Sequence, residues 1–265
     1  MAGREIAVQA VCFPHRQGTV LYACSPTGQE TIAGPGSDRA EEKIRLVSIL
    51  RKHLAGLEGS PGMGGRCSDR ADWPTQVVHD PLGRPRLRPA DCEGPAISFS
   101  EGGGKIWAAL GGNASEIGID AAGTDEFPDD YPFQRAFQDQ EVRRALRLTR
   151  GDLKKASALL WSIKEAVVKA LGCAFHLVDP RQIRVDPWAA EEDDGGIFRV
   201  SLSGKALDRF PLTASRGIRV RSFFQENMWL SLALLNRQRR RTEEICSPDG
   251  DPGQGLDSDG IESAP

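Results

Sequence analysis

Regularly spaced apolar residues mark the stretch LLWSIKEAVVKALG, at positions 159–172. Apolar side chains recur there at steps of three and four, a spacing that places them on one face of an α-helix. Gly172 follows the last of them and is a typical helix end. The pattern therefore predicts an amphipathic helix whose apolar face carries Leu159, Leu160, Ile163, Val167, Ala170 and Leu171.

Two other segments have helical patterns. The first is RAEEKIRLVSILRKHLAGL at 39–57, preceded by Ser37 and Asp38, either of which can cap its first turn. The second is QDQEVRRALRL at 138–148. Short runs of β-branched and small apolar residues between turn-forming segments predict strands. These strands are 5–13, 18–25, 96–100, 105–110, 117–120, 198–204, 217–225 and 228–235.

The order of these elements predicts an α+β protein with two lobes of similar size. Strands and a helix come first, and the pattern begins again near residue 112, which divides the chain into lobes at 1–111 and 112–236. Residues 237–265 begin with the basic RQRRR and continue as an acidic segment rich in Gly, Ser and Pro. Such a composition buries too little apolar surface to fold alone, so this tail is predicted to be disordered.

The distribution of charge narrows the classes of partner. The 265 residues carry a net charge of −3, but residues 243–265 contain seven acids and no Lys or Arg, so the body has a charge of +4. A mildly basic body favours a phosphate-rich small ligand or an acidic protein partner over extended nucleic acid. Six scattered cysteines without a CxxC pair, and the absence of a leader-like or membrane-spanning apolar run, predict a soluble cytoplasmic protein.

Candidate chemistry begins with the predicted helix at 159–172. Glu165 and Lys169 stand four residues apart, so they share one face, either as a surface ion pair or as two groups that reach a common ligand. Asp120 ends the apolar strand IGID, where it either caps a turn or faces a cleft. Two acids that converge with a lysine can hold Mg²⁺, which prefers oxygen ligands and shares substrate phosphates. This combination favours phosphoryl transfer.

Four segments, in order, resemble the motifs of the 4′-phosphopantetheinyl transferases of the surfactin-synthetase-activating type. GRPRL at 83–87 resembles the G-K/R-P-x-L turn of that family, and ISFSEGGGKIWAAL at 97–110 resembles its S-x-S-H-S strand. IGIDAA at 117–122 resembles the G-I/V-D-x-E element. WSIKEAVVKALG at 161–172 is similar to the W-S-x-K-E-A-x-x-K-A signature. The resemblance spans residues 80 to 175.

The resemblance implies a fold and an activity. The fold is two α+β lobes in a pseudo-twofold arrangement, with coenzyme A in the cleft between them, working as a monomer. The implied enzyme transfers the 4′-phosphopantetheine arm of coenzyme A to a serine of an acyl- or peptidyl-carrier protein, depends on Mg²⁺ and releases adenosine 3′,5′-bisphosphate. Neither nucleic acid nor a membrane is an expected partner.

The resemblance also implies roles for single residues. Asp120 and Glu165 are the expected Mg²⁺ ligands, Glu165 is the base that deprotonates the serine, and Lys169 contacts the pyrophosphate. The residues expected at coenzyme A are Lys164, which adds charge, Arg84 beside the nucleotide, either Arg45 or Lys43 at the 3′-phosphate, and Ser100 and Glu101 of the S-x-S-H-S segment. An ordinary solvated arginine is the alternative for Arg84.

Two positions depart from the family pattern. Ala122 stands where the family has a second metal-binding acid, and Glu101 stands where it has a histidine that meets the 3′-phosphate. A carboxylate at that place would repel a phosphate unless a cation such as Arg84 intervenes. The backbone N–H groups of the neighbouring glycines could also compensate. These departures support an alternative function, a catalytically weakened relative that binds carrier protein or nucleotide without turnover.

Overall fold

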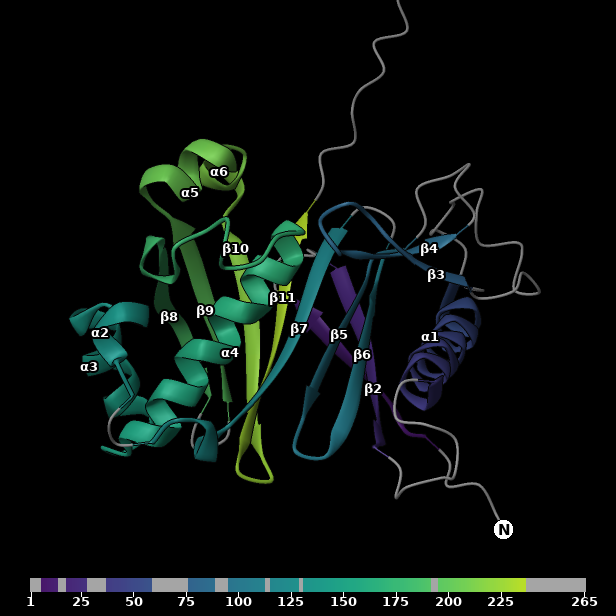
Figure 1. Ribbon diagram of the computed structural model, residues 1–265, viewed down its shortest axis with the longest axis horizontal. Helices are drawn as coiled ribbons and strands as arrows, with labels where there is room; N and C mark the ends of the chain where they lie inside the picture. Colours follow the sequence, from purple (N-terminus) through teal and green to yellow (C-terminus); the bar gives the residue numbers. More distant parts are fainter. Residues whose placement is uncertain are drawn as a thin grey trace, which may run out of the picture.

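The computed structural model of the chain describes residues 6–13, 18–27, 37–58, 76–88, 95–112, 115–128, 131–191 and 195–236. The chain is a mixed α/β protein with two large antiparallel sheets and one hairpin (Figure 1). The predicted tail at 237–265 lies outside the described residues. No helix in the described part of the chain is long and apolar enough to cross a membrane.

The first sheet has the strand order β1-β2-β6-β5, and a separate hairpin joins β3 to β4. Helix α1 packs against the sheet through Leu46, Val47 and Leu50, all fully buried. The elements of this part are β1 (Val8–Phe13), β2 (Gly18–Pro26), α1 (Ser37–Glu58), β3 (Gln76–His79), β4 (Pro85–Arg88), β5 (Ile97–Gly102) and β6 (Lys105–Gly111).

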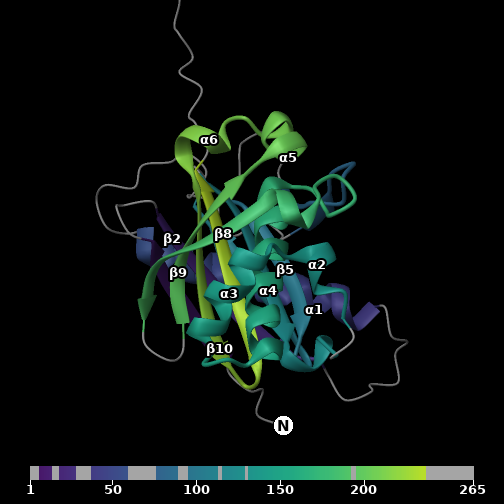
Figure 2. The same ribbon diagram turned by 90° about the vertical axis from the view of Figure 1, so that its left-hand side faces the viewer.

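The second sheet has the order β7-β11-β10-β9-β8, and the long helix α4 covers one of its faces (Figures 1 and 2). Helices α5 and α6 lie at one end of this sheet. The strands are β7 (Ser115–Gly123), β8 (Ile183–Glu191), β9 (Gly195–Leu202), β10 (Ile218–Gln225) and β11 (Met228–Asn236). The helices are η1 (Thr124–Glu126), α2 (Phe133–Ala136), α3 (Asp139–Leu148), α4 (Leu153–Leu171), η2 (Pro180–Gln182), α5 (Gly204–Arg209) and α6 (Thr213–Arg216).

The three helical patterns of the sequence are confirmed as α1, α3 and α4, and the eight predicted strands correspond to β1, β2, β5, β6, β7, β9, β10 and β11. Strand β3 was not predicted, and neither was β8. Strand β8 contains Pro187, which cannot donate to a ladder, and its pairing with β9 shifts between Pro187 and Ala189. The strand tolerates this proline because it forms the edge of its sheet.

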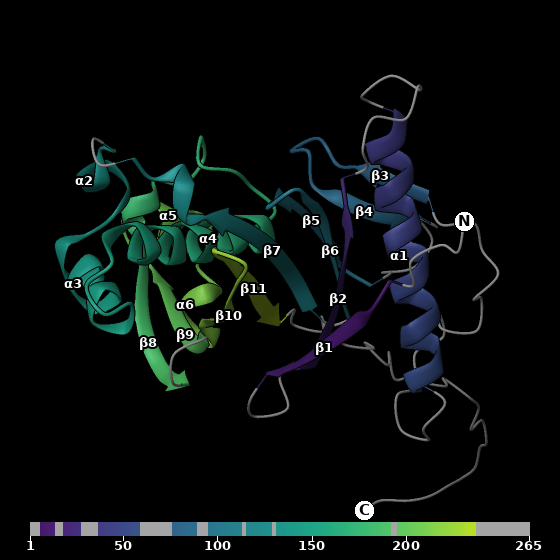
Figure 3. The ribbon, with the colours of Figure 1, turned by 90° about the horizontal axis from the view of Figure 1, so that it is seen from below.

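The two sheets meet where β5 lies beside β7, and serine side chains make this joint. Side chains alternate along a strand, so Ser98 and Ser100 share one face of β5. The Ser98 hydroxyl accepts a hydrogen bond from the Ile119 backbone N–H at 3.1 Å, and the Ser100 hydroxyl accepts one from the Ala121 N–H at 3.1 Å. Seen from below, α1 and the α2–α3 pair lie at opposite ends of the molecule (Figure 3), so the joint is central.

Candidate active site

Helix α4 lies directly on β7, and this close packing brings the predicted acids and lysine together. The side chain of Asp152 caps the first turn by accepting a hydrogen bond from the Lys155 N–H. The helix ends at Gly172 in the left-handed conformation, with φ of 72°. Between these ends, Gly118 of β7 faces the helix, where a Cβ atom would lie only 1.9 Å from the Ala166 carbonyl oxygen. Only glycine allows this approach.

Asp120 and Lys169 form an ion pair at the joint between the sheets. The Lys169 Nζ donates hydrogen bonds to the Asp120 Oδ1 at 2.6 Å and to the Ile119 carbonyl oxygen at 3.1 Å. The Ser100 hydroxyl donates to the same Asp120 oxygen at 3.0 Å, and it lies 3.3 Å from the Lys169 ammonium. Asp120 is 4% exposed, so its carboxylate is held by neighbours rather than by solvent.

Glu165 stands one helical turn before Lys169 and completes the cluster. Its carboxylate lies 3.7 Å from the Lys169 ammonium, which is closer to Asp120. Burial, together with the negative charge of Asp120, raises the pKa of Glu165 to about 7, and the positive charge of Lys169 offsets only part of this rise. A carboxyl group with a pKa near neutral can accept and release a proton under physiological conditions.

The donor set of this cluster fits one divalent cation. Among the described residues, no group of three or more His, Cys, Asp and Glu side chains gathers in a metal-binding arrangement. The Asp120 carboxylate nevertheless lies close enough to Glu165 to raise the pKa of Glu165. Mg²⁺ often binds proteins through one or two carboxylates and completes its shell with water and substrate phosphates. Ala122, at the position of the missing acid, is 1% exposed and packs in the core.

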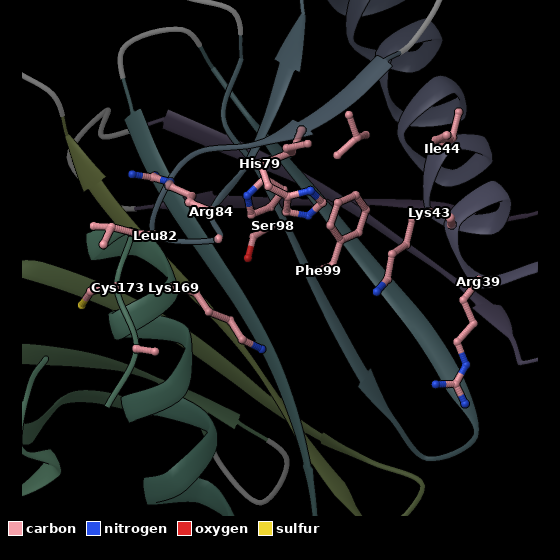
Figure 4. A pocket seen from close by; sticks show the side chains of 17 residues that line it. Arg39, Lys43, Ile44, His79, Leu82, Arg84, Ser98, Phe99, Lys169 and Cys173 are labelled. Carbon is pink, nitrogen blue, oxygen red and sulfur yellow. The ribbon is translucent and has the colours of Figure 1, made fainter. Parts of the chain in front are cut away.

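A pocket of about 540 Å³ opens beside Lys169 (Figure 4). Its walls come from α1, from the β3–β4 hairpin, from β5, and from the end of α4 with the residues that follow it. The side chains on these walls combine cations with an aromatic ring and aliphatic surface. Those labelled in Figure 4 are Arg39, Lys43, Ile44, His79, Leu82, Arg84, Ser98, Phe99, Lys169 and Cys173.

Arg84, which the resemblance places beside the nucleotide, lies in the pocket wall formed by the hairpin. Its side chain is only 8% exposed and pairs with Glu116 of β7, so it is not an ordinary solvated arginine. Gly172 leaves the space for it, because a Cβ atom there would lie 2.8 Å from the Arg84 Nη1. The helix end of α4 and the turn before β4 therefore fit together through this arginine.

Glu101 turns toward α1. Its carboxylate lies 2.9 Å from the Lys43 ammonium and 3.4 Å from the Arg39 guanidinium. The hydrogen bond from Lys43 lowers the pKa of Glu101, with a smaller contribution from the charge of Arg39. Glu101 is not among the residues that line the pocket, whereas both of its cationic partners are. The negative charge of Glu101 is therefore paired with two cations from α1 rather than with Arg84.

Lys164 and Arg45 also lie outside the lining of the pocket, whereas Lys43, the alternative to Arg45, is part of it. Lys164 is fully buried, and its Nζ donates to the Glu141 carboxylate at 2.9 Å and to the Ala136 and Pro180 carbonyl oxygens. Consecutive helix residues point in different directions, which explains why Lys164 does not accompany its neighbour Glu165. Arg45 pairs with Glu42 on its own helix at 3.4 Å and does not line the pocket.

Arg39, His79 and Phe99 also line the pocket, although no sequence motif marked them as site residues. Phe99 and Glu101 occupy alternate positions of β5 and so share the face toward α1, where the Lys43 ammonium lies 5.8 Å from the Phe99 ring centre. The strand alternation of ISFSE could have identified Phe99. His79 could not be identified, because nothing in its local pattern relates the hairpin to α1.

Comparison with known proteins gives a match for part of the chain. A family model described as "ACPS: 4'-phosphopantetheinyl transferase superfamily" matches residues 116–207. This segment contains Asp120, Glu165 and Lys169. No curated protein matches the sequence.

Solved structures of holo-acyl-carrier-protein synthases are similar to less than half of the chain. "Chronobacterium ammoniagenes ACPS-CoA complex" is 23% identical, covers 48% of this chain and 99% of its own, and has a TM-score of 0.38. The holo-ACP-synthase of Plasmodium yoelii is 15% identical over 46% of this chain and 94% of its own, with a TM-score of 0.37. The Thermotoga maritima holo-[acyl-carrier-protein] synthase is 16% identical over 46% of this chain and 64% of its own, with a TM-score of 0.34.

Proposed function

We propose that this protein transfers the 4′-phosphopantetheine arm of coenzyme A to a serine of an acyl- or peptidyl-carrier protein and releases adenosine 3′,5′-bisphosphate. The observation that carries the proposal is the convergence of Asp120, Glu165 and Lys169 at the edge of a cationic pocket. The family match over residues 116–207 supports the same reaction class. We also propose that the two sheets and their helices form the two pseudo-twofold lobes, and that the protein acts as a cytoplasmic monomer.

The proposed mechanism uses each member of the cluster at a stated atom. The Glu165 carboxylate takes the proton of the acceptor serine hydroxyl, directly or through water, which its pKa of about 7 allows near neutral pH. The serine oxygen then forms a bond to the phosphorus on the phosphopantetheine side. The bond from this phosphorus to the bridging oxygen breaks, and the bisphosphate leaves with the electron pair. The Lys169 ammonium hydrogen-bonds the pyrophosphate oxygens that gain charge.

Asp120 and Glu165 would hold Mg²⁺, which when bound supplies further positive charge for the pyrophosphate. Ser100 has a positioning role, since its hydroxyl contacts Asp120 and lies beside the Lys169 ammonium. In the pocket, Arg84 and Lys43 are placed to contact the nucleotide end of coenzyme A. These assignments leave the reacting phosphate at the α4 end of the pocket and the nucleotide between the hairpin and α1.

A second candidate function is binding of carrier protein or coenzyme A without turnover. It is motivated by Ala122, a buried core residue that stands where the family has a metal-binding acid. The cluster therefore has two carboxylates, Asp120 and Glu165, where the family pattern has three. Calorimetry separates the two functions. Tight binding of coenzyme A with Mg²⁺, and no transfer to any apo-carrier protein, would favour the second function.

The test of the proposed function is transfer to purified apo-carrier proteins. Incubation with coenzyme A and Mg²⁺ should add the mass of one phosphopantetheine arm to the carrier, detected by intact-protein mass spectrometry. Asp120→Asn, Glu165→Gln and Lys169→Ala should each abolish this gain while the protein stays folded. Lys52→Ala, an exposed lysine of α1 away from the pocket, is the matched control and should transfer at the wild-type rate. Wild-type transfer by all three site variants would refute the assignment.

A further inference from the structure

The cations of the pocket are already paired with carboxylates. Arg39 and Lys43 share Glu101 on the α1 side. On the other side, Arg84 pairs with a carboxylate of β7, and Lys169 pairs with two carboxylates of the catalytic cluster. A polyanionic ligand that enters this pocket therefore competes with resident carboxylates for nearly every cation.

His79 differs from these cations. It ends β3, where its backbone pairs with Pro85 of β4, and its side chain is exposed and lines the pocket (Figure 4). Among the described residues, its imidazole makes no hydrogen bond or ion pair. Imidazole is also the side chain whose charge ordinarily changes close to neutral pH. Its two N–H groups, when protonated, can donate to an anion without first leaving a carboxylate.

We propose that His79 is a phosphate-binding residue of this pocket and that its protonated imidazole contacts the 3′-phosphate of coenzyme A. The inference rests on the proposed function, which places the reacting pyrophosphate at Lys169. The remaining phosphate of coenzyme A is the one on the ribose, and the remaining pocket walls are the hairpin and α1, which carry His79 and Lys43. A hydrogen bond between imidazolium and phosphate is charge-assisted and hence stronger than a neutral one.

Several other charged or titratable groups surround this position, and each belongs to both the wild-type protein and a His79 variant. Asp80 follows His79 and accepts hydrogen bonds from the Leu82 and Arg84 backbone N–H groups. Glu165 titrates near pH 7 at the other end of the cluster, and the ligand's own phosphate also titrates near neutral pH. Only a comparison of variants at two pH values isolates His79. The remaining groups are Arg39, Lys43 and Glu101 toward α1, Arg84, Arg86 and Glu116 at the hairpin and β7, and Lys169 and Cys173 at the end of α4.

The experiment measures the Kd of coenzyme A and of 3′-dephospho-coenzyme A by calorimetry at pH 6 and pH 8. His79→Gln should weaken coenzyme A binding about tenfold at pH 6 and less than about twofold at pH 8. It should leave the Kd of the dephospho ligand unchanged at both pH values. His79→Lys keeps a positive charge at pH 8, so it should bind coenzyme A more tightly than the wild type there. His53→Gln, an exposed histidine of α1 that does not line the pocket, is the matched control.

Each outcome decides a different statement. Equal Kd values of wild type and His79→Gln for coenzyme A at pH 6 would overturn the role of His79 and leave the proposed function intact. An equal loss with the dephospho ligand would also overturn it, because the residue would then contact another part of the ligand. A wild-type protein that binds no coenzyme A would overturn the proposed function itself, and the inference with it.

Discussion

Replacement of Glu165 by glutamine should stabilise the protein at pH 8 while it abolishes transfer. Burial and the charge of Asp120 raise the pKa of this carboxyl from 4.5 to about 7. Between pH 4.5 and about pH 7, the folded protein therefore keeps a proton on the Glu165 carboxyl that the unfolded chain has already lost. The contribution of Glu165 to the free energy of unfolding falls as pH rises through this window and is constant above it. Glutamine cannot ionise, so the variant avoids this loss.

The size of the effect follows from the same two pKa values. Their difference corresponds to about 3 kcal/mol if the whole shift is expressed in stability. The Glu165 side chain is 29% exposed, so solvent screens part of the interaction. We expect the gain in unfolding free energy of Glu165→Gln to be about 1–2 kcal/mol larger at pH 8 than at pH 5.

Urea denaturation followed by circular dichroism, at pH 5 and pH 8 and without divalent cations, measures this difference. Glu41→Gln changes an exposed glutamate of α1 and serves as the control, with the same stability as the wild type at both pH values. A gain that does not depend on pH, or a variant less stable than the wild type at pH 8, would refute the reasoning. Either result would mean that burial and Asp120 do not disfavour the ionised form of Glu165.

Two further predictions concern packing. Gly118→Ala should lower the free energy of unfolding by about 3 kcal/mol, because its Cβ would overlap the Ala166 carbonyl oxygen, and an unchanged urea midpoint would contradict this. Lys164→Met should cost about 3–5 kcal/mol, since it leaves the Glu141 carboxylate buried without its cation. Adding Glu141→Gln should restore most of that loss, whereas additive effects in the double-mutant cycle would show that the two side chains act independently.

The sequence predicts those elements whose pattern is set by neighbouring residues along the chain. The apolar spacing of α4 identified the buried face, and Gly172 marked its end, because both features are local. Strand β8 escaped detection because its proline and its shifted pairing are tolerated only at a sheet edge, and the edge is a property of the assembled sheet.

Only the residues of the candidate site that lie in the family-like motifs could be predicted from the sequence. The contact between Asp120 and Lys169 joins residues 49 positions apart, so helix periodicity alone could not predict it. Helix geometry could have predicted that Lys164 and Glu165 point in different directions, because they are consecutive residues of one helix. The ion pair between Glu101 and Lys43 could not be predicted, because Lys43 lies on α1, and the position of this helix depends on how it packs against the first sheet.

The hydroxyl groups of Ser98 and Ser100 carry a mechanical consequence. They replace part of a backbone ladder between β5 and β7 with two side-chain contacts. Ser100 also hydrogen-bonds Asp120, so any movement of one sheet against the other must displace a group that contacts the candidate site. A shift of β5 against β7 would therefore also change the contact at the Asp120 carboxylate, because one oxygen atom of Ser100 bonds both the Ala121 backbone and Asp120.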